Sequence, residues 1–168
     1  MHLGYTKFIV NTEQHNVLFK EGYLIPVDSK KYPAAERTSK LINQYRSQYP
    51  ELLEVIAKMK QPAMRLYNQE STIGNLLTDF MRSASNSDIA FLNSGAIRAD
   101  LNAGPVTLEQ LINVYPFPDN LTVVELSGKQ VKELIEYSLT LTYGVGQISG
   151  LKIQFDSTQP KMQRLVSI

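Results

Sequence analysis

The sequence contains no cysteine, and this absence excludes disulfide bonds, thiol nucleophiles and metal sites built on thiolates. Histidine is also scarce. His2 and His15 are the only two, and their spacing matches neither H-E-x-x-H nor another common metal-binding motif. We therefore expect no metal site in this chain.

Neither sign of charge dominates, because 17 lysines and arginines are balanced by 16 aspartates and glutamates, which leaves a formal net charge of +1. This balance produces no field that would draw the molecule to nucleic acid, so any anion must be bound locally. No run of 18 or more consecutive apolar residues is present, and the pattern predicts no membrane span. The first residues also lack the charged and apolar regions of a secretory signal.

The pattern predicts a chain of mixed helices and strands that begins with a β-hairpin. The hairpin is predicted over 4–10 and 17–27, and the polar stretch 28–33 follows it as a linker. Residues 51–64 fit a short helix or a strand equally well. The other predicted elements are helices over 34–49 and 71–83, helices behind capping boxes at 107–110 and 127–130, strands over 88–92, 122–126, 151–155 and 164–168, and a turn at Gly104-Pro105.

The segment NSGAIR, residues 93–98, follows a short apolar strand. Asn93 can donate and accept hydrogen bonds, Gly95 lets a ligand approach the backbone closely, and Arg98 offers a two-pronged donor that matches phosphate or carboxylate. Ligands often bind where such strands end. The spacing alone fits an ordinary turn with a solvent-facing arginine at least as well.

The segment YPFPD, residues 115–119, holds Phe117 between two prolines directly after a predicted helix. A ring fixed in this way can stack on a nucleobase, although covering the core is the more usual role of an aromatic side chain. No candidate catalytic residue accompanies it. Ser94 lacks a G-x-S-x-G context and has no histidine nearby to complete a triad, and the acidic residues show no pairing that would serve one substrate.

Six motifs taken together resemble the C-terminal domain of the 5'-nucleotidase family. They are E-x-x-x-G-N-L at 70–76, NSGAIR at 93–98, G-P-V-T at 104–107, Y-P-F at 115–117, V-V-E-L-S-G-K-Q-V at 123–131 and Q-I-S-G-L at 147–151. The resemblance implies an α+β fold with helices packed on a mixed, mostly non-sequential sheet. It also implies that 1–33 are the last hairpin and linker of a metallophosphoesterase domain and that 34–168 are the C-terminal domain. Because the apolar run at 164–168 has no cap, we expect this second domain to be incomplete.

The resemblance implies the nucleotide-binding portion of a metal-dependent phosphoester hydrolase, inactive by itself. In that family two divalent metal ions lie in the N-terminal domain, so no cofactor is expected here, and the partners are that domain and a nucleotide or related phosphate ester. Asn93, Gly95 and Arg98 are assigned to the substrate phosphate and Phe117 to the nucleobase. Family members are usually exported, which implies a periplasmic or extracellular protein. Pairing of exposed strands could also join two copies of the chain.

Two positions depart from the family pattern. Tyr67 stands where members commonly have an arginine, with Arg65 two residues before it. Asp119, which the resemblance also assigns to substrate binding, places a carboxylate where an amide is usual. We expect a weakened or reorganised phosphate site. Two alternatives therefore stay open: a non-catalytic binding or partner module with a degenerate phosphate site, or a family member that acts on cyclic nucleotides, 3'-nucleotides or UDP-sugars.

Overall fold

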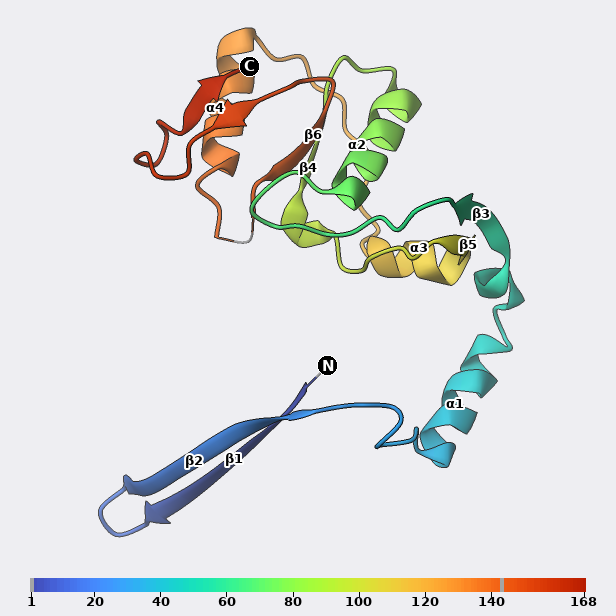
Figure 1. Ribbon diagram of the computed structural model, residues 1–168, viewed down its shortest axis with the longest axis vertical. Helices are drawn as coiled ribbons and strands as arrows, with labels where there is room; N and C mark the ends of the chain where they lie inside the picture. Colours follow the sequence, from blue (N-terminus) through green and yellow to red (C-terminus); the bar gives the residue numbers. More distant parts are fainter. Residues whose placement is uncertain (1, 143) are drawn as a thin grey trace. The chain divides into compact units, whose positions relative to one another are not determined.

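The computed structural model describes residues 2–142 and 144–168 of the chain, shown in Figure 1. They form two compact units, Met1–Tyr49 and Pro50–Ile168. Within the described residues, no helix combines the length and the apolar character that crossing a bilayer requires.

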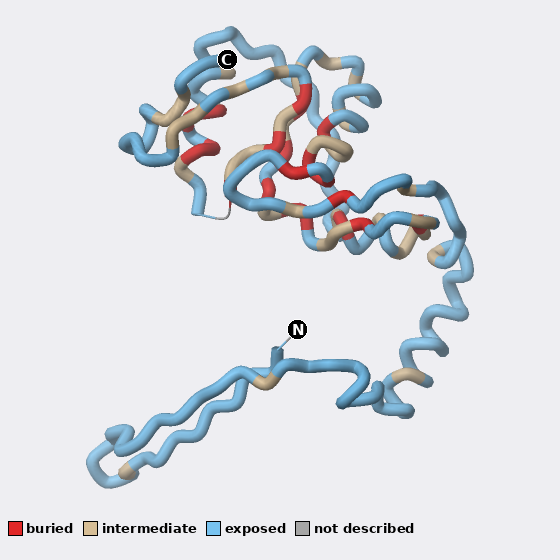
Figure 2. The backbone as a smooth tube through the Cα atoms, in the orientation of Figure 1, coloured by how far each residue is buried: buried red, intermediate tan, exposed pale blue. Residues whose placement is uncertain are grey.

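The first unit consists of the predicted hairpin and one helix. Strands β1 (His2–Asn11) and β2 (Asn16–Pro26) pair in antiparallel register, and α1 (Glu36–Arg46) follows the linker. The turn forms because the Asn11 side chain accepts hydrogen bonds from the amides of Glu13 and Gln14, each 2.9 Å long. None of the described residues in these three elements is buried, as the pale tube in Figure 2 shows.

The second unit holds all the buried residues of the described chain, which Figure 2 colours red. Three two-stranded sheets pair β3 with β5, β4 with β6 and β7 with β8, all antiparallel. The elements in chain order are η1 (Pro50–Leu53), β3 (Val55–Met59), α2 (Thr72–Ser85), β4 (Ala90–Asn93), η2 (Ser94–Ala96), β5 (Gly104–Thr107), α3 (Leu108–Val114), α4 (Gly128–Ser138), β6 (Gly146–Ser149), β7 (Gln154–Phe155) and β8 (Leu165–Ser167).

The core of this unit lies where α2 packs on β4 and β6. Ile73 of α2 and Val114 of α3 are completely buried, and Ile97 is 2% exposed. Both predicted capping boxes are present, since Thr107 pairs with Gln110 and Ser127 with Gln130. These local signals fix where α3 and α4 begin.

Several sequence predictions are corrected by the structure. The α+β class and the non-sequential pairing are confirmed, but the predicted mixed sheet is a set of small antiparallel sheets. Gly104-Pro105 starts β5 instead of forming a turn, because Gly104 pairs with Met59 of β3. In the 151–155 region only Gln154–Phe155 is a strand, and the unpredicted β6 lies just before it. Phe80 lies at helical spacing from Ile73 and Leu76, which predicts a place on the buried apolar face, but it is 61% exposed.

The predicted strand at 122–126 does not form. A strand requires a hydrogen-bonded partner, and this segment borders a cavity of about 480 Å³ whose other walls include residues of β4, β6 and α4. Val123 and Val124 are 63% and 65% exposed. Its β-branched composition is typical of a strand, but no described strand pairs with it.

Candidate functional site

The NSGAIR loop begins where β4 ends and is held rigidly by its backbone. Ser94–Ala96 forms a single 3-10 turn, closed by the Ile97 amide donating to the Ser94 carbonyl at 3.1 Å. The Arg98 amide then donates to the carbonyl of Val114 at 2.8 Å, which ties the loop to the end of α3. Because Ser94, Ala96 and Ile97 are buried while Asn93 and Arg98 are exposed, the loop presents its polar side chains outward from a fixed base.

The exposed residues of this loop line a pocket of about 550 Å³. Tyr67, Asn68 and Thr142 complete its lining beside Asn93, Gly95 and Arg98. Arg98 is the single charged residue among the described residues of this lining, and its Nη1 donates to the Gly95 carbonyl at 3.1 Å. One guanidinium surrounded by amides and hydroxyls is a donor set suited to an oxyanion.

A buried amide, Gln147 of β6, joins the segments around this pocket. Its side chain is 2% exposed, and its Oε1 accepts hydrogen bonds from the amide and the hydroxyl of Ser71, both at 2.9 Å. Its Nε2 donates to the Ser94 hydroxyl at 2.8 Å and to the Gln69 carbonyl at 3.0 Å. Ser71 is also the N-cap of α2, so one side chain connects the start of that helix, the NSGAIR loop and the segment that carries Tyr67.

Gly74, the glycine of the G-N-L motif, leaves room for the side-chain amide of Gln147. A Cβ built on Gly74 would lie 2.1 Å from Gln147 Oε1 and 2.5 Å from its Cγ. No side chain fits at this separation. The position of the Gln147 side chain therefore requires a residue without a Cβ at position 74, although 73 positions separate the two residues in the sequence.

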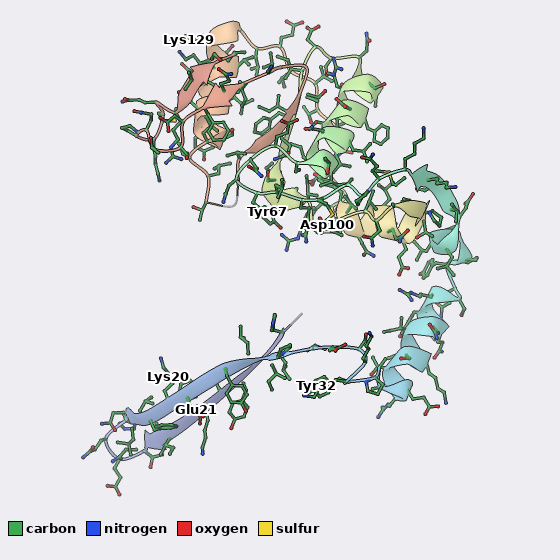
Figure 3. The ribbon with its side chains drawn as sticks, viewed as in Figure 1. Lys20, Glu21, Tyr32, Tyr67, Asp100 and Lys129 are labelled. Atoms are coloured by element: carbon green, nitrogen blue, oxygen red, sulfur yellow. The ribbon has the colours of Figure 1, made fainter. Side chains whose placement is uncertain are left out.

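The segment that carries Tyr67 also lines the pocket and is anchored at two points. The Val145 amide donates to the Tyr67 carbonyl at 2.7 Å, and Gly144, with φ of +104°, passes so close that a Cβ there would lie 2.3 Å from the same carbonyl oxygen. Arg65 forms an ion pair with Asp100 at 3.2 Å. Figure 3 labels Tyr67 and Asp100 on this side of the unit.

The YPFPD loop lies outside the lining of this pocket. Phe117 is 42% exposed and packs edge-on against Tyr115, with ring centroids 5.6 Å apart. The Tyr115 hydroxyl donates to Asp119 Oδ2 at 2.8 Å. Burial, followed by this hydrogen bond and the charge of Asp119, raises the pKa of the Tyr115 phenol above its ordinary value. Asp119 therefore serves as the acceptor for a tyrosine in its own loop.

Three of the five predicted site residues, Asn93, Gly95 and Arg98, thus share one pocket, and Phe117 and Asp119 do not line it. Sequence reasoning did not assign Asn68, Thr142 or Gln147 to a site. Gln147 is the first residue of the Q-I-S-G-L motif at 147–151, so the sequence did contain a signal for it. Nothing in the sequence singled out Asn68 or Thr142. In residues 2–142 and 144–168, no cluster of three or more histidines, aspartates or glutamates could hold a metal ion.

Comparison with known proteins identifies similar chains. The family described as 5'-nucleotidase, C-terminal domain, matches residues 55–168. The endonuclease YhcR of Bacillus subtilis is 28% identical over 95% of this chain and 13% of its own length. The trifunctional nucleotide phosphoesterase protein YfkN of the same organism is 32% identical over 60% of this chain and 7% of its own length. A crystal structure of a 5'-nucleotidase precursor from Thermus thermophilus superimposes with a TM-score of 0.86 and 26% identity, over 98% of this chain and 35% of that one.

These relatives are much longer than the chain described here, which spans 13% and 7% of the two curated proteins and 35% of the solved structure. The similarity to the Thermus thermophilus structure includes nearly the whole chain, and the family match begins within the second unit, at residue 55.

Proposed function

Since this chain belongs to the 5'-nucleotidase C-terminal domain family, we propose that it is the substrate-binding portion of a 5'-nucleotidase-like phosphoester hydrolase. The ligand would be a nucleotide or a related phosphate ester. The observation that supports this proposal is the pocket at the end of β4, where Arg98 stands among the uncharged donors Asn93, Asn68 and Thr142. Arg98 would bind the phosphate, with the other side chains completing the hydrogen bonds to its oxygens.

Phe117 is proposed as the contact for the nucleobase. It follows the end of α3, whose last residue, Val114, accepts the hydrogen bond from the Arg98 amide. The ring is partly exposed and backed by Tyr115, which leaves part of its surface available for stacking. Asp119, which faces the Tyr115 hydroxyl, would hold this loop in shape instead of contacting the phosphate.

The hydrolytic chemistry is assigned to a metallophosphoesterase domain outside this chain. The described residues offer no group of ligands that fits a divalent metal pair, so we assign the metal ions to that other domain. The contribution of this chain would be binding and orientation of the phosphate ester. The hairpin β1–β2 is proposed to belong to that other domain, and its exposed apolar residues, including Leu3, Phe8 and Leu24, fit a partner surface.

The test is a titration of the isotopically labelled chain with AMP, followed by the amide signals of Asn93, Gly95 and Arg98 in two-dimensional NMR spectra. A site with one cation is expected to bind in the millimolar range, and Arg98→Ala should weaken AMP binding about tenfold or more, because a hydrogen bond to a charged group is lost. Arg37→Ala, an exposed arginine of α1, is the matched control and should leave the affinity unchanged.

Phe117→Ala should weaken AMP but not ribose 5-phosphate, because only the nucleotide carries a base to stack. If saturating AMP moves none of the pocket amides, or if Arg98→Ala binds as well as the unmodified chain, the proposal is wrong. Phosphate release by the isolated chain in the presence of Mn²⁺ would contradict the assignment of the chemistry to another domain.

A further inference from the structure

A cavity of about 480 Å³ beside β4, the β4 cavity, is lined by two stretches of backbone that each lack a hydrogen-bonded neighbour. One is the segment 121–126, which makes no backbone hydrogen bond among the described residues. The other is β4, which pairs with β6 along one edge and with no described strand along the other. Ala90 and Leu92 of β4 are each 7% exposed, so water has little access to the free edge. Buried backbone groups are nearly always paired in proteins, and a chain placed between the two stretches would pair with both.

The size of the β4 cavity fits an inserted β-strand. A strand in a packed sheet occupies about 160 Å³ per residue, because its rise is about 3.3 Å, its neighbours lie about 4.8 Å away and the layer is about 10 Å thick. The cavity therefore holds about three residues of extended chain.

Both faces of such a strand would meet apolar side chains. Met81 of α2 and the residues Leu134 and Ile135 of α4 line the cavity. Figure 1 shows the β4–β6 pair between these two helices. A strand that is covered on both faces is typically a continuous apolar run, and β-branched residues favour its extended conformation. The centre of the inserted segment is therefore expected to be apolar.

The charged groups of the cavity are both acidic. Asp88 and Glu125 are the only charged side chains among the described residues of its lining. Both residues are exposed, and neither carboxylate makes an ion pair or a hydrogen bond within the described part of the chain. A lysine or arginine in the inserted segment would compensate these charges, whereas an acidic segment would be repelled. Charge complementarity therefore selects a basic segment.

We propose that the β4 cavity is a binding site for an extended polypeptide segment, apolar at its centre and basic at its ends, which inserts as a β-strand between β4 and the segment 121–126. In this mode of recognition the backbone hydrogen bonds supply affinity and the side-chain contacts supply specificity. The inference goes beyond the proposed function and does not depend on it, because the β4 cavity and the pocket lined by Arg98 share no described residue.

The probe is a short peptide, acetylated and amidated, with three central valines, a threonine on each side of them and a lysine at each end. It is titrated into the isotopically labelled chain while the amide signals of Phe91, Val123 and Val124 are followed. These amides are expected to shift, to exchange more slowly with solvent and to show nuclear Overhauser contacts to the peptide backbone. Replacing the central valine of the peptide by proline should weaken binding about tenfold or more, because one backbone donor is removed and its acceptor stays buried and unpaired.

Variants of the protein test the backbone and the charges separately. Val123→Pro and Val124→Pro change a segment without backbone hydrogen bonds among the described residues, so both variants should fold. Successive amides of an extended chain point to opposite edges, so one of the two variants should weaken the lysine peptide about tenfold and the other should not. Glu125→Lys should weaken the lysine peptide severalfold and tighten a matched peptide with glutamate ends. Glu51→Lys, an exposed glutamate of η1 outside the lining, is the control.

Several outcomes would overturn the proposal. Equal affinity for the valine and proline peptides, or no shift of the cavity amides at millimolar peptide, would show that no strand inserts. Slow exchange of the amides of 122–126 without peptide, with contacts to β4, would show that the segment itself closes the cavity. Shifts that depend on protein concentration alone would assign the cavity to a second copy of the chain. The AMP titration reports on the other pocket, so the two proposals fail separately, and the spectra report whether each variant is folded.

Discussion

Replacing Gly74 by alanine tests whether the buried amide of Gln147 organises the site. The added Cβ would lie 2.1, 2.5 and 2.6 Å from the Oε1, Cγ and Cδ atoms of Gln147. Since three atoms of one side chain are too close, a small rotation of the amide cannot relieve the overlap. Gln147 must leave its position, and its hydrogen bonds to Ser71, Ser94 and Gln69 are then lost.

The magnitude follows from those four hydrogen bonds. A net contribution of about 1 kcal/mol each, with a further cost for any buried polar group left unpaired, amounts to about 3–5 kcal/mol. Alanine in place of glycine within a helix stabilises the folded state by about 1 kcal/mol, which offsets part of this loss. The expected loss in the free energy of unfolding is therefore about 2–4 kcal/mol, a large part of the 5–15 kcal/mol that is typical of a domain.

The assay is urea denaturation followed by circular dichroism, with Gly128→Ala as the matched control. Gly128 opens α4, and a Cβ built there meets no atom within 4 Å. The control should be neutral or slightly stabilising, because alanine favours the helix and nothing obstructs it. If Gly74→Ala falls within about 0.5 kcal/mol of the control, a spread usual for surface substitutions, then Gln147 does not hold the three segments together as described.

Two further predictions concern groups at the edge of the site. Asp119→Asn should lower the pKa of Tyr115 towards, but not fully to, its ordinary value of 10.0, because burial is the larger cause of the shift and stays in place. The ring signals of the tyrosine in a pH titration measure this pKa. An unchanged titration would show that the Asp119 carboxylate has no part in the shift. Because the raised pKa favours the neutral phenol in the folded protein, this contribution to stability is complete below pH 10.0 and is lost as pH rises through the folded value. Asp100→Asn should cost about 1 kcal/mol in urea denaturation, since its partly exposed ion pair with Arg65 is screened by solvent. The same variant should tighten AMP binding severalfold by leaving the charge of Arg65 uncompensated, and weaker AMP binding would show that this charge does not act on the ligand.

Short-range signals account for what was predicted correctly. The capping boxes at Thr107 and Ser127 involve partners three residues away, and the hairpin turn at Asn11 is closed by amides two and three residues on. Such contacts form whatever the rest of the chain does, so they can be read directly from the order of residues. The predicted strand at 122–126 failed for the opposite reason, because its composition could not supply a pairing partner.

The amino-acid sequence by itself determined the helix starts, the hairpin and the donor set of the NSGAIR loop, in which Asn93 and Arg98 are five residues apart. Only the tertiary structure decided which other groups meet that loop. Gln147 reaches Ser71 across 76 positions, and Arg65 reaches Asp100 across 35. The physical reason is that contacts of this range depend on strand register and helix packing, which fix where distant segments meet. The sequence alone therefore supplied the polar side chains of a candidate anion site, while the fold placed Tyr67 beside them in the pocket lining.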